Sequence, residues 1–269
     1  MIMREVPTFR VQAFREKHAR YACAVFVLNE NGRLHAQLGR MLPYADLVDI
    51  VIADGGSTDG SVGEDLLAPR GVRALLTKTG PGKLSAQMRM AMAWAMDEGY
   101  DGLIVIDGNN KDDPAAIPLF TAGLDRGLDH LQGSRFIPGG HAENTPPARL
   151  LGIHLLHAPL ISLAARTRYT DTTNGFRAYS RRLLLDVRVA PFRDVFSAYE
   201  LHYYLAIRAS RLGFRVEEVP VTRAYPAHGP VPTKISPVRG SIKILRTLMH
   251  ACLHLYDPPT NRSGTKAHG

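Results

Sequence analysis

The stretch Ile50-Val51-Ile52-Ala53-Asp54-Gly55-Gly56-Ser57-Thr58-Asp59-Gly60-Ser61 decides the fold of this chain. Its four apolar residues are typical of a strand buried on both faces of a parallel sheet, and an acidic, glycine-rich turn follows at once. A carboxylate at such a strand end can accept hydrogen bonds from a nucleobase or ribose, and glycine lets the backbone approach a ligand closely. Because Gly, Ser, Asp and Thr also fill ordinary strand-to-helix turns, this stretch alone leaves a ligand site and a plain turn equally open.

Apolar runs alternate with helix-like segments along the first half of the chain. We expect strands over 21–28 (the first), 47–53, 72–76, 102–106 and 129–132, and helices over 32–41, 60–67, 83–98 and 115–123. This alternation predicts an α/β fold of βαβ units, a Rossmann-like, mostly parallel sheet with helices on both faces. In such sheets ligands bind at the carboxyl ends of the strands, where Asp54 and Asp107 both fall. The two aspartates are therefore expected to belong to one site.

The second half of the chain is less regular. We expect a mobile loop over 139–147, an apolar helical region over 150–165, a polar turn over 171–175, a helix over 198–212, a strand over 216–221, a proline-rich loop over 227–237 and a final helix over 241–256. The chain is accordingly divided into an N-terminal segment (1–20), an α/β domain (21–236), and a C-terminal amphipathic helix with a tail (237–269).

Composition narrows the cellular setting and the class of ligand. The 269 residues are 45% hydrophobic and contain two cysteines, which suits a globular protein of a reducing compartment and leads us to expect a cytoplasmic chain. The region Leu150–Ala165 is interrupted by His154, His157 and Pro159, and is expected to be too short and broken to span a membrane. The net charge of +8 fits phosphorylated ligands or a membrane surface. No helix-turn-helix, zinc-finger or RNA-binding aromatic pattern favours nucleic acid.

A second acidic segment follows the strand expected over 102–106. Its sequence is Asp107-Gly108-Asn109-Asn110-Lys111-Asp112-Asp113-Pro114. A carboxylate and an amide oxygen two residues apart at a strand end can share a divalent cation that bridges a diphosphate. A capped helix start is the other interpretation, because an aspartate directly before proline suits the first turn of a helix. We assign Asp107 and Asn109 to the functional role and Asp113 to the cap.

Taken in order, the motifs of the chain resemble the family-2 glycosyltransferases of the GT-A fold, and most closely their dolichyl- or polyprenyl-phosphate mannosyltransferase branch. The resemblance covers roughly residues 21–236. Each motif is weak alone, but nine in this order are specific: Asn29-Glu30, Asp54 to Ser61, Lys83, Asp107-Gly108-Asn109, Gly133-Ser134-Arg135-Phe136, the loop to Arg149, Asp171 to Arg177, Glu218 to Val221, and Thr233-Lys234-Ile235. Such enzymes transfer a sugar from a nucleoside diphosphate with inversion at the anomeric carbon.

The resemblance also implies roles for individual residues. Donor binding would fall to Asn29, Glu30, Asp54, Gly55, Lys83 and Asp107, with the nucleoside held by Glu30 and Asp54. The catalytic and acceptor side would comprise Arg135, Arg149, Asp171 and Lys234, with both arginines binding phosphate and Lys234 closing over the site from its loop. Arginine suits this task because its planar guanidinium matches phosphate oxygens and does not lose its charge.

Departures from the family pattern concern the metal and the nucleobase. The usual Asp-x-Asp is Asp107-Gly108-Asn109 here, and Lys111 stands where a neutral ligand is common. Either Lys111 partly replaces the metal's charge, or it points to solvent while Asp107 and Asn109 still bind Mg²⁺ or Mn²⁺; we favour the second alternative slightly. The proline and tyrosine usual before Asn-Glu are Phe26 and Leu28, so contacts to the base are expected to differ.

The acceptor decides whether the reaction needs a catalytic base. A lipid phosphate is already an anion, whereas a sugar hydroxyl needs a carboxylate, for which Asp171 and then Glu200 are the candidates. We expect transfer of a sugar from a GDP-mannose type donor to a polyprenyl phosphate. The alternative is a UDP-sugar and a hydroxyl acceptor in surface polysaccharide or lipid-linked glycan synthesis. A non-catalytic nucleotide-sugar-binding module is a third, lower-ranked hypothesis.

The last helix and the apolar region over 150–165 bear on membrane contact. The helix places basic residues such as Lys243 and Arg246 on one side and apolar residues such as Leu248 and Cys252 on the other. Basic amphipathic helices can lie on anionic membranes, although a helix that packs its apolar side on the core gives the same pattern. A lipid-phosphate acceptor would require peripheral contact with the inner face of a membrane.

Overall fold

Strand β2 (Tyr21–Val27) lies at the centre of the parallel part of the sheet, and all of its residues are buried. It pairs in parallel with β3 (Asp49–Asp54) on one side and β5 (Gly102–Asp107) on the other. Val27 lies opposite Asp54, and Phe26 lies opposite Asp107. The carboxyl ends of β3 and β5 are therefore level, as the sequence predicted. The computed structural model describes residues 4–227 and 239–259.

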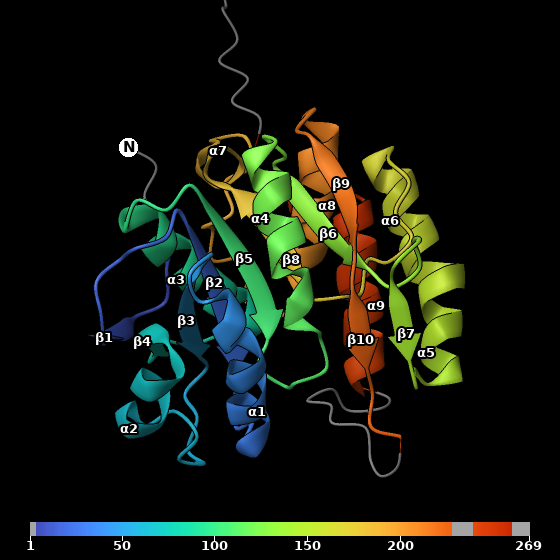
Figure 1. The fold of residues 1–269 in the computed structure, drawn as a ribbon. Helices are drawn as coiled ribbons and strands as arrows, with labels where there is room; N and C mark the ends of the chain where they lie inside the picture. Colours follow the sequence, from blue (N-terminus) through green and yellow to red (C-terminus); the bar gives the residue numbers. More distant parts are fainter. Residues whose placement is uncertain (1–3, 228–238, 260–269) are drawn as a thin grey trace, which may run out of the picture.

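The main sheet has eight strands in the order β1-β4-β3-β2-β5-β8-β6-β9 (Figure 1). The strands not yet given are β1 (Phe9–Ala13), β4 (Val72–Lys78), β6 (His130–Ser134), β8 (Arg177–Ser180) and β9 (Val216–Pro220). The pairs β2·β3, β2·β5, β3·β4 and β6·β9 are parallel, whereas β1·β4, β5·β8 and β6·β8 are antiparallel. A mostly parallel sheet is confirmed.

Three helical segments form a further layer beside the β6 and β9 end of the sheet (Figure 1). One is a continuous helix made of α5 (Pro147–Gly152), a π-helical turn (Ile153–His157) and α6 (Ala158–Ala165). The others are α8 (Glu200–Arg211) and α9 (Arg239–Cys252). Ile161, Ile207 and Leu248 join them in one apolar cluster. The predicted C-terminal helical extension is confirmed.

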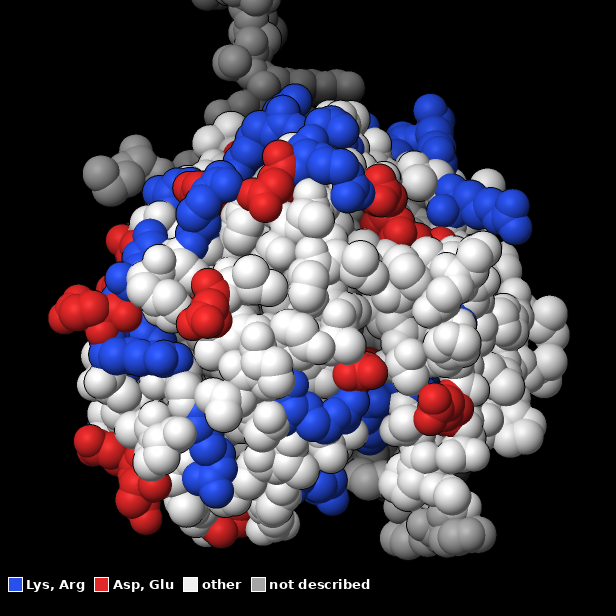
Figure 2. Space-filling model, viewed as in Figure 1, with Lys and Arg blue, Asp and Glu red and all other residues white. Residues whose placement is uncertain are grey.

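The expectation that 150–165 is too short and broken to span a membrane is wrong on both points. The helix runs without a break over Pro147–Ala165, 19 residues with a mean hydropathy of 1.4, because Pro159 falls in the first turn of α6 and the π-helical turn precedes it. Within the described residues it is the helix long and apolar enough to cross a membrane, by length and composition only. Little of it is covered, since 22% is buried, and Figure 2 shows an extended surface with few charges over α5 and α6.

Four short strands differ from the sequence-based expectations. The first strand is β1 and not the segment beginning at Tyr21. It pairs with β4 at the sheet edge, where most of its residues are exposed. The loop over 139–147, expected to be mobile, contains β7 (His141–Glu143), which pairs with β10 (Thr222–Ala224). Strand β8 was not expected, because its four residues directly follow the polar turn. Each is specified by its partner strand rather than by its own pattern.

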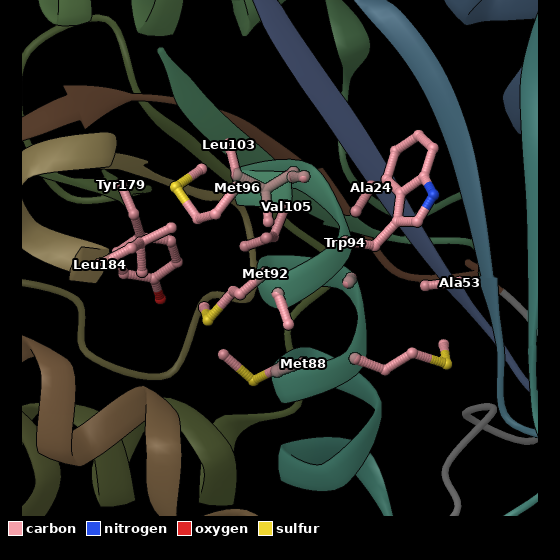
Figure 3. Packing of buried hydrophobic residues seen from close by; sticks show 14 of the residues in the cluster. Ala24, Ala53, Met88, Met92, Trp94, Met96, Leu103, Val105, Tyr179 and Leu184 are labelled. Carbon is pink, nitrogen blue, oxygen red and sulfur yellow. The ribbon is translucent and has the colours of Figure 1, made fainter. Parts of the chain in front are cut away.

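Helices cover both faces of the sheet. On one face lie α1 (Gly32–Met41), α2 (Glu64–Leu67) and α4 (Ile117–Asp125), and on the other α3 (Leu84–Asp97), α7 (Arg181–Leu185) and α8; single turns of 3₁₀ helix occur at Leu42–Tyr44, Ala68–Arg70 and Pro114–Ala116. Each face of the sheet packs against its helices in a separate hydrophobic core. Successive residues of β2 point into opposite cores, Ala24 on the α3 side and Val25 on the α1 side. Figure 3 shows Met92 and Met96 of α3 among apolar side chains of the sheet.

The core on the α4 side provides a test of the fold. Phe120 is fully buried, and its ring centroid lies 4.5 Å from that of Phe176. We expect Phe120→Ala to lower the free energy of unfolding by about 3–5 kcal/mol, because it leaves a cavity that the sheet cannot fill. The neighbouring Leu119 is 46% exposed, and Leu119→Ala should change stability by no more than about 0.5 kcal/mol. Urea unfolding measures both, and equal losses would contradict this placement of α4.

Candidate active site

The turns after β2 and β3 are tied together by side chain to backbone hydrogen bonds. Asn29 adopts a φ of 51°, its N–H donates to Ser57 Oγ at 2.9 Å, and its Oδ1 accepts from the Thr58 N–H at 2.8 Å. Asp54 is fully buried, and its carboxylate accepts from the Ser57 N–H (2.9 Å) and hydroxyl (2.6 Å). Asp54 therefore shapes the turn from inside.

The other residues assigned to the donor lie along the same edge. Glu30 is 8% exposed and pairs with Arg33 at 2.9 Å. A Cβ added at Gly55 would lie 3.4 Å from the Val27 carbonyl oxygen, so the backbones of the two turns approach closely here. Lys83 is exposed at the N-terminus of α3, and its N–H donates to the Ser197 carbonyl at 2.7 Å. These residues are gathered at the carboxyl ends of β2 and β3.

Asp107, at the end of β5, has a cationic partner that the sequence did not indicate. Its Oδ2 accepts from Arg223 Nη2 of β10 at 3.1 Å and, more weakly, from Asn109 Nδ2 at 3.4 Å. The Asn109 Oδ1 accepts from the Lys111 N–H at 3.2 Å. Both residues expected to bind a metal are thus engaged with donors from the protein.

Arg223 also pairs with Asp112, which is fully buried. Burial disfavours the charged guanidinium, but the charges of Asp112 and Asp107 outweigh this effect and raise the pKa of Arg223. The pairing depends on a bridge between Asp112 and Arg223, which brings residues 111 positions apart side by side. A separation of this length leaves no local signal in the sequence. By contrast, Asp113 accepts from the Ala115 N–H at 3.1 Å and has the capping role that the sequence predicted.

Three cations surround the ring of Tyr225, and we call Lys111, Arg149 and Arg223 the cationic cluster. Their charged groups lie 5.1, 5.3 and 5.8 Å from the ring centroid, in that order. Arg149 Nη1 also donates to the Tyr225 hydroxyl oxygen at 2.6 Å. Lys111 is only 7% exposed, so the expectation that it points to solvent is wrong, whereas metal binding by Asp107 and Asn109 stays a prediction.

The electrostatics of the cluster follow from this crowding. Burial, followed by the charge of Arg223, lowers the pKa of Lys111. Burial alone would raise the pKa of Tyr225, but the charges of Arg223 and Arg149 outweigh it and lower that pKa. The surroundings of Tyr225 thus favour negative charge, as a phosphate site requires.

The donor set fits a divalent cation poorly. Mg²⁺ and Mn²⁺ prefer several carboxylate or neutral oxygen ligands. At the end of β5 they would find one carboxylate already paired with Arg223, one amide oxygen that accepts from the Lys111 N–H, and the charge of the Lys111 side chain, which interacts electrostatically with Asp107. Across residues 4–227 and 239–259, no group of three or more His, Cys, Asp or Glu is placed to hold a metal ion. We derive no step through a metal.

Arg135 and Asp171 form a buried, two-pronged ion pair. Arg135 Nε and Nη2 donate to the two Asp171 oxygens at 2.6 and 3.0 Å, and the residues are 3% and 0% exposed. Burial would raise the pKa of Asp171, but the hydrogen bonds and charge of Arg135 outweigh it and the pKa is lowered. The Arg135 Nη1 atom is buried without a hydrogen-bond partner among the described residues. The pair fixes the turn 171–175 to the end of β6.

Glu200 and Lys234 are the two predicted residues not yet described. Glu200 is the first residue of α8 and accepts from the Ala198 N–H at 2.6 Å, which ties the preceding turn to the start of the helix. Lys234 lies outside the described residues. The structure therefore brings together Asp107, Asn109 and Arg149, with Arg223 and Tyr225 as members that the sequence did not indicate.

Curated proteins of known activity resemble this chain in sequence. Polyprenol monophosphomannose synthase of Mycolicibacterium smegmatis is 29% identical over 205 residues, which cover 72% of this chain and 73% of that protein. Undecaprenyl-phosphate mannosyltransferase of Micrococcus luteus is 27% identical over 198 residues, covering 72% and 79%. Dolichyl-phosphate hexose transferase of Haloferax volcanii is 30% identical over 137 residues, covering 51% and 55%. No family model matches the sequence.

Solved structures agree on the fold. Glucosyl-3-phosphoglycerate synthase of Mycobacterium tuberculosis in complex with UDP superposes with a TM-score of 0.60 at 21% identity, covering 89% of this chain and 81% of that one. The same enzyme with Mn²⁺, UDP-glucose and phosphoglyceric acid gives a TM-score of 0.60 at 19% identity, with the same coverage. The chain is a glycosyltransferase with the GT-A fold, similar in sequence to polyprenyl-phosphate mannosyltransferases.

Proposed function

We propose that the protein transfers a sugar from a nucleoside-diphosphate donor of the GDP-mannose type to a polyprenyl phosphate, with inversion at the anomeric carbon. The observation that carries the proposal is the position of the cationic cluster beside Asp107. The donor turns of β2 and β3 lie along one edge of the sheet, and Lys111, Arg149 and Arg223 lie where β5 ends at that edge. Sequence relatives named for polyprenyl- and undecaprenyl-phosphate mannosyl transfer support the acceptor.

The geometry favours a phosphate acceptor over a hydroxyl acceptor. A phosphate oxygen is anionic at neutral pH and can attack the anomeric carbon opposite the leaving diphosphate without losing a proton. A hydroxyl needs a general base within hydrogen-bond reach of its proton. Asp171 has both oxygens engaged by Arg135, and Glu200 is engaged by the Ala198 N–H in the turn before α8. Neither carboxylate suits the role of base, so we assign Asp171 to positioning Arg135 and Arg149 to binding the acceptor phosphate.

A UDP-sugar with a hydroxyl acceptor remains the second candidate function. Its support is the glucosyl-3-phosphoglycerate synthase structure with UDP-glucose, which shares the fold at 19% identity. At this level of identity only the fold carries over. Leu28, one of the residues expected to change the contacts to the base, is 40% exposed beside the donor turn, and a Cβ added at Gly55 would contact its side chain at 3.5 Å.

Access to a lipid acceptor would come from peripheral membrane contact through two helices. The helix Pro147–Ala165 contains Arg149 in its first turn and exposes Leu151, Leu155 and Leu163 at 61–79%. Helix α9 adds exposed apolar side chains: Ile242, Leu245 and Met249. Packing on the core therefore leaves part of the apolar side of α9 exposed. A surface of this kind can enter the headgroup region of a bilayer while the active site faces the lipid phosphate.

The donor and acceptor can be tested with purified protein in detergent. We expect GDP-mannose and a short-chain polyprenyl phosphate to give an organic-soluble mannosyl lipid, whose glycosyl phosphate bond is acid-labile. Transfer needs no general base, because the phosphate acceptor is already an anion. Parallel reactions use UDP-glucose and a sugar alcohol as acceptor. Transfer to the hydroxyl acceptor alone would contradict the proposal and favour the second candidate function.

Arg149 should act on the acceptor. We expect Arg149→Met to lower kcat/KM for the polyprenyl phosphate by about tenfold or more, because a hydrogen bond to a charged group contributes about 1.5–3 kcal/mol. The Kd for the free nucleotide should change little. Arg126→Met serves as the matched control. Arg126 pairs with Glu217 at 2.9 Å near the amino end of β9, away from the carboxyl ends of the strands. An unchanged kcat/KM for Arg149→Met would remove this residue from the acceptor site.

The role assigned to Asp171 predicts a pH dependence. Its pKa in the folded protein is lowered, so the charged carboxylate stabilises the fold above its ordinary pKa of about 3.9, and this contribution is lost as the pH falls through the lower folded value. We expect Asp171→Asn to cost about 3–5 kcal/mol at neutral pH, because it leaves Arg135 buried and unpaired.

Urea unfolding between pH 3 and pH 7 would measure both effects. Asp186→Asn is the control, because Asp186 is also paired in a two-pronged manner, with Arg188, but at the surface. A loss for Asp171→Asn no larger than that for Asp186→Asn would contradict a positioning role. Loss of activity with unchanged stability would instead restore Asp171 as a candidate base.

A further inference from the structure

The charges at the end of β5 are balanced by side chains of the protein. Arg223 contacts two carboxylates of this region, Asp107 and Asp112, whereas Asp113 pairs with Arg40. The ammonium group of Lys111 lies 5.1 Å from the Tyr225 ring and Arg223 lies 5.8 Å from it, so the two cations share one site. Two carboxylates and two fixed cations carry the same net charge as two carboxylates and one divalent cation.

A divalent cation added to this arrangement would meet opposing effects. It would have to compete with the guanidinium of Arg223 for Asp107, and it would also meet the charge of Lys111, which interacts electrostatically with Asp107. Repulsion between like charges is strong where burial lowers the effective dielectric constant, and Arg223 and Lys111 are each only 7% exposed. Asn109 offers one amide oxygen, which already accepts from the Lys111 N–H.

We propose that Arg223 and Lys111 take the place of the divalent cation, and that their charges neutralise the diphosphate of the donor without a metal ion. The inference rests on the proposed function, because it assumes that a nucleoside diphosphate binds at the end of β5. Arg223 contributes through a fixed charge held by Asp107 and Asp112, which needs no reorganisation when the leaving group develops charge. Lys111 supplies the second charge from the same turn as Asn109.

The arrangement distinguishes diphosphate from monophosphate nucleotides. The nucleoside is held at the turns after β2 and β3, whereas Lys111 and Arg223 lie where β5 ends. A nucleoside monophosphate would reach the turns after β2 and β3 but would lack the β-phosphate that the two cations recognise. The β-phosphate should therefore strengthen binding in the absence of any metal.

Calorimetric titration of the full chain with GDP, GMP, UDP and UMP tests the proposal. Each nucleotide is titrated once in EDTA and once in Mn²⁺. We expect the preferred diphosphate to bind with a Kd in EDTA within about threefold of that in Mn²⁺, and about tenfold more tightly than its monophosphate. Tightening of tenfold or more by Mn²⁺ would overturn the inference and leave the donor site intact. No binding of any nucleotide in either buffer would instead contradict the proposed function.

Variants separate the two cations from the fold. Lys111→Met should weaken diphosphate binding in EDTA by about tenfold and leave monophosphate binding unchanged. Arg223→Met should do the same and, because Asp107 is then unpaired, should make binding respond to Mn²⁺. Where Arg223→Met fails to fold, Lys111→Met alone decides, with Arg126→Met as the control. Unchanged diphosphate binding by Lys111→Met would overturn the inference.

Discussion

The ion pairs of Arg223 with Asp107 and Asp112 join two parts of the chain that are distant in sequence. Asp107 ends the central strand β5, whereas Arg223 lies in β10, a strand of the small second sheet. Breaking the pairs would leave Asp112 buried without a cation, which is costly in an environment of low dielectric constant. The contact therefore fixes β10 against the end of β5. Tyr225 directly follows β10, and Arg149 of α5 contacts Tyr225.

This constraint connects the architecture to the chemistry. The parallel strands β2, β3 and β5 create an edge at which donor turns can form, as open α/β sheets generally do. The second sheet then brings positive charge to that edge from the other half of the chain. Such an edge can bind both a diphosphate donor and a phosphate acceptor, and transfer of the sugar between them needs no catalytic base. Buried Arg135 and Asp171 support the same edge from the side of β6.

The sequence predicted the parts of the molecule whose signals are local. Strands such as β2 and β5 are continuous apolar runs, α1 was predicted with its observed bounds, and Asp113 was predicted as a cap. The order of the family motifs along the chain also led us to assign Asp107 and Arg149 to one site. The sequence did not indicate Arg223 or Tyr225, because their roles depend on a strand pairing across more than a hundred residues. Nor did it reveal that Lys111 is buried, since a lysine in a turn is usually solvated.

Anomalous diffraction from crystals grown with GDP and Mn²⁺ would test the central claim most directly. The account predicts electron density for the nucleotide diphosphate at the carboxyl ends of β2, β3 and β5, next to Lys111, with Arg223 still paired to Asp107 and no manganese signal between Asp107 and the diphosphate. A manganese peak at that position, with Arg223 displaced from Asp107, would contradict it.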